Sequence, residues 1–474
     1  MGSQLESNLM NIAEHRPQPQ DFFQTRRGFL NRFGMGFAGL SMASMLGESL
    51  TSSAHGAIVN PLAPRQSHFP AKAKHVIHIF AQGGPTHLDT WDPKPEMAKH
   101  ADKKVDLIGG TPLPSPFKFT KMGKSGIEVS EIFPELGKHI DEMAIVRSLH
   151  TDIPSHEFAT VLMNTGSGRL VKPSLGSWVL YGLGTENQNL PGFVALGAGL
   201  GGSQNYRSAF LPGAYQGTPV QQAGGDIEKV IQNIRNYHLP LAEQREQLDL
   251  LQKLNEKHSE NLKRESELEA RIQSYELAFK MQTEATDAFD ISKESAATKA
   301  LYGDTPMARQ MLTARRLVEK GVRFVQVWHG GWDHHSNIAQ NARRKAGEVD
   351  QPIAALIADL KQRGMLDDTL IVWSGEFGRT PRHDRGGRAE PGRDHHNRGF
   401  SGWLAGGGVK GGTVHGATDE FGYNAVQDKV HVHDLHATIL ALLGFDHEKL
   451  TYRYNGRNFR LTDVYGNVVK KIIA

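Results

Sequence analysis

The chain has 474 residues, no cysteine, 54 Lys+Arg against 51 Asp+Glu, and a formal net charge of +3. The lack of cysteine excludes disulfide scaffolds, iron–sulfur proteins, thiolate zinc sites and cysteine hydrolases. Because positive and negative charges are nearly balanced and no long run of one sign occurs, we expect no nucleic acid partner. No apolar run reaches the about 18 residues that a membrane span requires. The 23 histidines, roughly twice the ordinary share, favour metal or proton chemistry.

Residues 1–57 are predicted to be an export leader. Thr25-Arg-Arg-Gly-Phe-Leu30 precedes an uncharged stretch, residues 33–47, and then small residues up to Ala54. Paired arginines followed by such segments are typical of a twin-arginine signal, which is read by the twin-arginine export machinery. The alternative is a short buried helix, but each glycine in the apolar stretch would cost about 1 kcal/mol there. We therefore expect a periplasmic or extracellular protein whose mature chain has no membrane span.

Strands and helices are expected to alternate through residues 58–474. Apolar runs predict strands at 75–80, 144–146, 322–328 and 369–373, and helical periodicity predicts helices at 155–165, 306–320 and a long one ending near Gly364. Asp434 reads as the N-cap of a helix that ends at Gly444, and Asn455-Gly456 predicts a type I′ hairpin turn. This alternation favours an α/β fold with a largely parallel sheet and helices on both faces.

Residues 225–295 are polar, densely charged and poor in glycine. Two narrow apolar stripes run through them at helical spacing: Leu251, Leu254, His258 and Leu262, then Leu268, Ile272, Tyr275 and Phe279. We interpret this segment as a helical hairpin inserted in the α/β domain, or as an oligomer contact, rather than as a catalytic element.

Polar clusters follow the predicted strands, and in an open parallel sheet the carboxyl ends of the strands are where ligands bind. These clusters contain imidazoles and carboxylates, which suit Zn, Mn or Fe, and a two-metal site needs about six such groups. The candidate ligands are His87, Asp89, Asp333, His335, Glu376 and His395. Taken singly, each cluster is more often a capped turn or a surface pair than a metal site. Arg379 could bind an anionic substrate oxygen or pair with a nearby carboxylate.

An ordered set of segments resembles domain-of-unknown-function family 1501, a family of exported bacterial proteins related to sulfatases within the alkaline phosphatase superfamily. The matching segments are Gly83–Pro95, Thr165-Gly166, Tyr302–Pro306, Gly331–Asn337, Ser374–Pro381, Gly392–His396 and Asp434–Gly444. The resemblance implies an alkaline-phosphatase-like three-layer α/β/α sandwich. It also implies one or two divalent ions at the carboxyl edge of the sheet, with Zn, Mn, Ca and Fe not distinguished.

The resemblance also locates a catalytic position. Relatives cleave phosphate or sulfate esters with a Ser, Thr or modified Cys placed nine residues before a Thr-Gly pair, where this chain has His156. An imidazole there can be a nucleophile, a general base or a ligand, or can mean that ester chemistry is absent; Ser155 and Thr160 are nearby substitutes. Relatives have one or two metal-binding Asp where this chain has Gln82-Gly83, and a His where it has Phe377. His87 and Asp89 could compensate from the next turn.

Three functions follow from these observations. The first is an exported metal-dependent hydrolase of sulfate or phosphate esters, with His156 and Arg379 in catalytic roles and an anionic ester substrate such as a sulfated or phosphorylated polysaccharide. The second is a non-catalytic exported binding or surface protein that keeps the metallohydrolase fold. The third is transferase or mutase chemistry on that fold.

Overall fold

A computed structural model describes residues 60–197, 202–221, 238–261, 276, 279–280, 287–384 and 390–474. The predicted export leader lies outside these residues. Within the described part of the chain, no helix has both the length and the apolar character that crossing a bilayer requires.

A mostly parallel sheet forms the centre of the molecule, with the strand order β12-β4-β11-β8-β1-β7-β5-β6 and with β15 paired to β4. β11 runs antiparallel to β4 and β8, and the other pairings are parallel. The strands are β1 (His75–Ala81), β4 (Met143–His150), β5 (Phe193–Leu196), β6 (Thr218–Val220), β7 (Phe324–His329), β8 (Thr369–Ser374), β11 (Phe400–Ala405), β12 (Thr413–His415) and β15 (Val430–His431).

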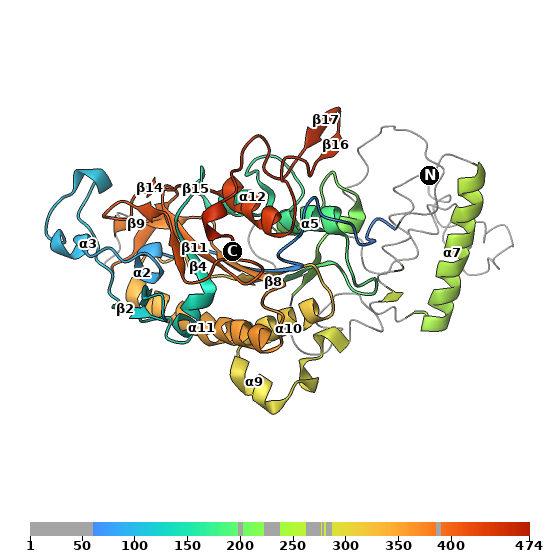
Figure 1. Ribbon diagram of the computed structural model, residues 1–474, viewed down its shortest axis with the longest axis horizontal. Helices are drawn as coiled ribbons and strands as arrows, with labels where there is room; N and C mark the ends of the chain where they lie inside the picture. Colours follow the sequence, from blue (N-terminus) through green and yellow to red (C-terminus); the bar gives the residue numbers. More distant parts are fainter. Residues whose placement is uncertain are drawn as a thin grey trace, which may run out of the picture.

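The sheet is buried on both faces. Along β1, Ile77 and Ile79 pack into one hydrophobic cluster while Val76 and Phe80 pack into another, as the alternation of side chains along a strand requires. The first cluster includes apolar residues of α10 and α11, and the second includes those of α5 and α12. Figure 1 shows α10 and α11 below the sheet and α5 and α12 above it. The predicted three-layer α/β/α sandwich is therefore confirmed.

The α-helices of the described residues are α2 (His87–Thr90), α3 (Glu96–Lys99), α4 (His156–Thr165), α5 (Leu175–Leu183), α7 (Leu241–Asn261), α9 (Ala296–Tyr302), α10 (Pro306–Glu319), α11 (Ile338–Gln362) and α12 (Val432–Leu442). The helices predicted at 155–165 and 306–320 and the long one ending near Gly364 correspond to α4, α10 and α11, whereas α2, α3, α5 and α9 were not predicted. The cap of α12 differs from the prediction: His431 is the N-cap, and Asp434 lies three residues inside, where its carboxylate accepts from the His431 N–H. Asp434 thus closes a capping box instead of starting the helix.

Short two-stranded ribbons lie outside the central sheet. They are β2 (Phe119–Met122) with β3 (Ile127–Ser130), β9 (Gly378–His383) with β10 (Arg393–His396), β13 (Ala417–Thr418) with β14 (Ala425–Gln427), and β16 (Tyr452–Tyr454) with β17 (Arg457–Phe459). Asn455 and Gly456 between β16 and β17 both have positive φ, which a type I′ turn requires.

The predicted helical insertion is described only in part. α7 stands at one end of the molecule, away from β9 in Figure 1. Arg245 on α7 forms an ion pair with Glu276 of the later segment, at 2.5 Å, and its guanidinium lies 5.3 Å from the Phe279 ring. Leu248 and Leu251 are buried, whereas Leu254 is 46% exposed; the buried side of α7 is therefore rotated from the predicted stripe. His258 has no described side chain, and Leu262, Leu268, Ile272 and Tyr275 lie outside the described residues.

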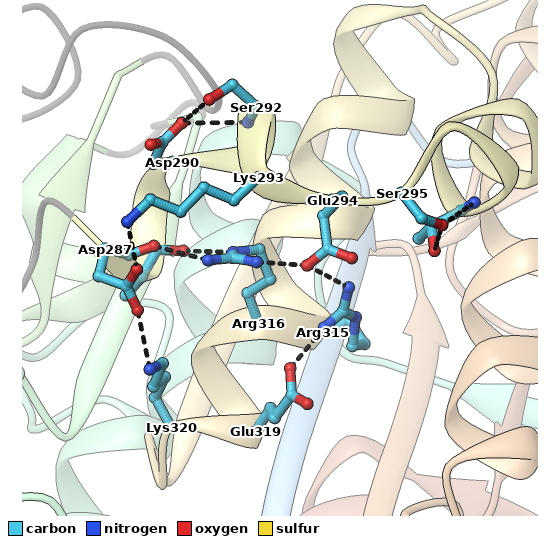
Figure 2. A network of polar contacts seen from close by, with 12 residues as sticks. Asp287, Asp290, Ser292, Lys293, Glu294, Ser295, Arg315, Arg316, Glu319 and Lys320 are labelled. Atoms are coloured by element: carbon cyan, nitrogen blue, oxygen red, sulfur yellow. Dashed lines mark hydrogen bonds and ion pairs between the residues drawn. The ribbon is translucent and has the colours of Figure 1, made fainter.

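A buried ionic network fastens the end of the insertion to α10 (Figure 2). Arg315 is 1% exposed and pairs with Glu294 at 2.7 Å and with Asp359 at 3.0 Å. Arg316 donates to the carbonyl oxygens of Asp287 and Ala288. The chain is thus held by charges in low dielectric, where removing one partner costs far more than at the surface.

Candidate active site

The candidate site lies at the carboxyl edge of the parallel strands. β1, β4, β7 and β8 end at this edge, because the strands run parallel to one another across the sheet. His156 is the first residue of α4, after β4; Asp333 and His335 follow β7; Glu376 follows β8; and His395 lies on β10. Four separate segments thus supply these side chains.

Close backbone approaches hold the loop after β7 in place. Gly83 has a φ of +114°, and a Cβ there would lie 2.6 Å from the Asp333 nitrogen. A Cβ on Gly392 would lie 2.0 Å from the carbonyl carbon of His335. Because any side chain at either glycine would collide with backbone, these two positions fix the loop that carries Asp333 and His335.

One carboxylate oxygen is the centre of the cluster. Asp333 Oδ1 lies 2.9 Å from His335 Nε2, 3.2 Å from His156 Nε2 and 3.3 Å from His395 Nε2. The Nε2 atoms of His335 and His395 are 3.0 Å apart. A guanidinium nitrogen of Arg379 donates to the same Asp333 oxygen at 2.5 Å. Imidazoles from three segments thus face one carboxylate.

Glu376 lies behind this cluster. Its side chain is fully buried, and Oε1 accepts from His156 Nδ1 at 2.5 Å. The Gly83 N–H also donates to the Glu376 carboxylate, with distances of 2.9 and 3.1 Å to its two oxygens. Glu376 was predicted as a metal ligand, but in this arrangement it orients His156, in the manner of a carboxylate that supports a ligating histidine.

The charges around His156 and Asp333 stabilise each other. Burial acts to lower the pKa of His156, but hydrogen bonds and attraction from Asp333 and Glu376 outweigh it and raise that pKa to about 9. Burial acts to raise the pKa of Asp333, but His156, His395 and Arg379 hold it well below its ordinary value. In the metal-free protein at neutral pH, His156 is therefore an imidazolium between two carboxylates.

Two groups of side chains could hold a cation. The ligand atoms of His156, Asp333 and His395 lie within 4.8 Å of one another, and those of His335, Asp384 and Asp394 form a second such group. Imidazole nitrogens and a carboxylate oxygen are the donors that Zn²⁺ and similar ions prefer. His156 Nε2 is buried and its nearest polar neighbour is Asp333 Oδ1, at 3.2 Å, which suits an atom that binds a metal together with that carboxylate. The residues present thus fit the implied ion.

Asp384 and Asp394 were not among the predicted ligands. His335 Nδ1 is 2.9 Å from Asp384 Oδ2 and 4.0 Å from Asp394 Oδ1. Asp394 stands beside His395 in the Gly-Arg-Asp-His-His run, so that run was the available signal; Asp384 lies in a glycine-rich stretch of sequence that gave none.

Two predicted ligands are not brought to this cluster. His87 is buried on α2, with Nε2 at 2.8 Å from the Gly422 carbonyl oxygen. Asp89 is fully buried and accepts two hydrogen bonds from Arg393, at 2.8 and 3.0 Å. Because the carboxylate of Asp89 is used by this ion pair, His87 and Asp89 do not compensate for the missing ligands after β1.

Arg379 takes the second of the two roles left open by the sequence. Its side chain is fully buried and donates to the Gly84 carbonyl at 2.9 Å, the Arg393 carbonyl at 3.1 Å, the Gly83 carbonyl and Asp333. The donor groups of this guanidinium are engaged by protein oxygens in this structure. In this arrangement Arg379 positions Asp333 and the turn after β1, and its catalytic role stays a prediction.

Solved structures with a similar chain path include sulfatases and alkaline phosphatases. The PsFucS1 sulfatase from Pseudoalteromonas sp. is 13% identical, with a TM-score of 0.35 over 79% of this chain and 68% of that chain. The lipoteichoic acid synthase LtaP from Listeria monocytogenes is 10% identical, with a TM-score of 0.34 over 81% and 76%. The alkaline phosphatase from the Antarctic bacterium TAB5 is 12% identical, with a TM-score of 0.31 over 71% and 92%.

No curated protein matches the sequence. Residues 73–473 match the family described as a protein of unknown function, DUF1501, and the chain belongs to that family.

Proposed function

We propose that this protein is an exported, metal-dependent hydrolase of phosphate or sulfate esters. The observation that carries the proposal is the meeting of His156, His335 and His395 around Asp333 at the carboxyl edge of the sheet. These residues are spread over more than 200 positions of the chain, and a structural role in the fold would not require three imidazoles to face one carboxylate.

Each residue of the cluster would have its own role in ester hydrolysis. A divalent cation held there would polarise the ester and supply a nucleophile by lowering the pKa of a water molecule. Asp333 is 44% exposed and His395 24% exposed, so substrate can approach from this side. The N-terminus of α4, where His156 stands, favours an anionic group by its dipole and free N–H groups. Glu376 and Arg379 hold His156 and Asp333 in place.

Turnover of model esters tests this function. The protein, loaded in turn with Zn²⁺ and Mn²⁺, is assayed with aryl phosphate and aryl sulfate, before and after chelation. We expect metal-dependent release of the phenol, lost in Asp333→Asn and retained in His100→Gln, a partly exposed histidine paired to Glu96. Metal-loaded protein that hydrolyses neither ester would refute the proposal.

Export is part of the same proposal. The twin-arginine motif predicts a periplasmic or extracellular protein, and residues 1–57 lie outside the described part of the chain. We expect the full chain to be recovered from the exported fraction, and a variant with Arg26→Lys and Arg27→Lys to stay in the cytoplasm. Recovery of both chains in the cytoplasm would contradict the export part alone.

A non-catalytic binding protein is the second candidate. It is favoured by His156, which stands where relatives are expected to carry a Ser or Thr nucleophile and whose two nitrogens both face carboxylates. Under this alternative, the metal-loaded protein retains an anionic polysaccharide on a column but releases no sulfate or phosphate from it. A third possibility, transfer of the group to another alcohol, would be recognised by product analysis with and without an acceptor.

A further inference from the structure

We infer that His156, His335, His395 and Asp333 form a single nitrogen-rich site for a Zn²⁺-type ion, that His156 is one of its ligands, and that the site rejects Ca²⁺ and Mg²⁺. This inference deepens the proposed function, since it assigns the metal class and the role of His156 within the same site.

In each histidine, a hydrogen bond at Nδ1 places a proton on that nitrogen. His156 Nδ1 donates to the Glu376 carboxylate at 2.5 Å, His335 Nδ1 to the Asp384 carboxylate at 2.9 Å, and His395 Nδ1 to the Pro154 carbonyl at 3.1 Å. A carboxylate or a carbonyl oxygen can only accept, so each Nδ1 carries the proton. Each Nε2 is the nitrogen that faces Asp333, so a cation that replaced the proton there would meet the nitrogen that ligating histidines present.

Four of the six distances among these donor atoms match those between ligands of one ion. The Nε2 atoms of His335, His156 and His395 lie 2.9, 3.2 and 3.3 Å from Asp333 Oδ1, and two of these nitrogens are 3.0 Å apart. A tetrahedron with metal–ligand bonds of about 2.0 Å has edges of about 3.3 Å. A shared cation at this position would replace the proton on His156 Nε2 and be bound by the four donors together.

The donor set decides the class of metal. Ca²⁺ takes six to eight oxygens at about 2.3–2.6 Å, and Mg²⁺ takes a near-octahedral oxygen set, whereas imidazoles suit Zn²⁺, Cu²⁺, Fe²⁺ and Ni²⁺. Asp333 is the one carboxylate among the four donors. Glu376 is occupied by His156 and the Gly83 N–H, and Asp384 accepts from His335, so neither is placed to complete an oxygen shell.

His156 accordingly acts through its lone pair on the metal and not as a nucleophile. It stands at the start of α4, where the resemblance implies an attacking Ser or Thr. An Nε2 atom that binds the ion cannot also attack an ester, so the attacking group in a hydrolase of this kind has to come from solvent.

Competition between metals tests the assignment without any assay of activity. Metal-stripped protein is dialysed against equal concentrations of Zn²⁺, Mn²⁺, Ca²⁺ and Mg²⁺, and bound metals are counted by elemental analysis. We expect about one Zn²⁺ per chain and no retained Ca²⁺ or Mg²⁺. His156→Gln, His335→Gln and His395→Gln should each weaken Zn²⁺ binding by at least about 100-fold in chelator competition, while His100→Gln should leave it unchanged. Circular dichroism verifies that each variant is folded.

The results of these measurements distinguish the metal assignment from the proposed function. Retention of Ca²⁺ or Mg²⁺ in preference to Zn²⁺, or a folded His156→Gln protein with unchanged Zn²⁺ affinity, overturns the inference. Zn²⁺ bound with the expected loss in the variants, but no ester hydrolysis, supports the inference and refutes the proposed function. Hydrolysis supported by Ca²⁺ alone supports the proposed function and overturns the inference.

Discussion

Replacing His156 by Gln should remove a pH-dependent part of the stability of the metal-free protein. The pKa of His156 is raised from 6.5 to about 9 because Asp333 and Glu376 stabilise its charged form more than burial opposes it. A raised pKa stabilises the fold fully below pH 6.5, and this stabilisation is lost as the pH rises through about 9. At about 1.4 kcal/mol per pKa unit, it amounts to about 3 kcal/mol.

The expected change in melting temperature follows from the size of the chain. An unfolding entropy of about 2.1 cal/mol/K per residue gives roughly 0.8 kcal/mol/K for the described residues, so about 3 kcal/mol corresponds to about 4 °C. Calorimetry in the presence of a chelator should show the wild-type protein gaining this advantage over His156→Gln at pH 6 and losing it by pH 10. The His100→Gln variant is the control. A wild-type advantage that stays constant, or that grows with pH, would refute the reasoning.

Three further substitutions test the buried contacts. Glu376→Gln should weaken Zn²⁺ binding about 10- to 100-fold, because a neutral amide supports a ligating histidine less well; unchanged affinity in chelator competition would contradict its orienting role. Asp89→Asn leaves the fully buried Arg393 without its counter-charge and should cost about 3–5 kcal/mol in urea unfolding, and a loss below about 1 kcal/mol would show that the pair is dispensable. Arg315→Met should cost a similar amount of stability. The control is Arg309→Met, whose carboxylate partner is 96% exposed, and it should change stability by about 0–1 kcal/mol. Equal losses in the two variants would contradict the importance of the network in Figure 2.

The layers of the fold were predictable because each rests on a local pattern. The apolar runs at 75–80, 322–328 and 369–373 become β1, β7 and β8, which are neighbours in the sheet. Parallel direction then places whatever follows these strands at one edge. The direction of β11 was not predictable, since the apolar run at 400–405 has the same pattern in a parallel or an antiparallel strand.

The membership of the site was predictable only in part, because a carboxylate after a strand has the same local sequence whether it binds a metal or an arginine. Asp89 and Asp333 both follow strands that lie side by side, yet Asp89 is paired with Arg393, 304 positions away. Nothing near Asp89 in the sequence reports that partner. For the same reason the sequence could not distinguish Glu376, which lies behind an imidazole, from Asp333, which faces three of them.

An imidazole stands at the start of α4, where the resemblance implies a hydroxyl, and it determines what the site can bind. A serine there would offer one oxygen, whereas His156 offers Nδ1 to Glu376 and Nε2 to the group around Asp333. Asp333 and Glu376 place two negative charges here, and Arg379 supplies one fixed positive charge. The cluster therefore requires a further positive charge, and His156 can accommodate it in either of two forms: a proton on Nε2, which explains the raised pKa, or a metal ion at the same lone pair. Because the proton and the metal would compete for one atom, we expect His156 to lose its Nε2 proton when the metal of the proposed site binds.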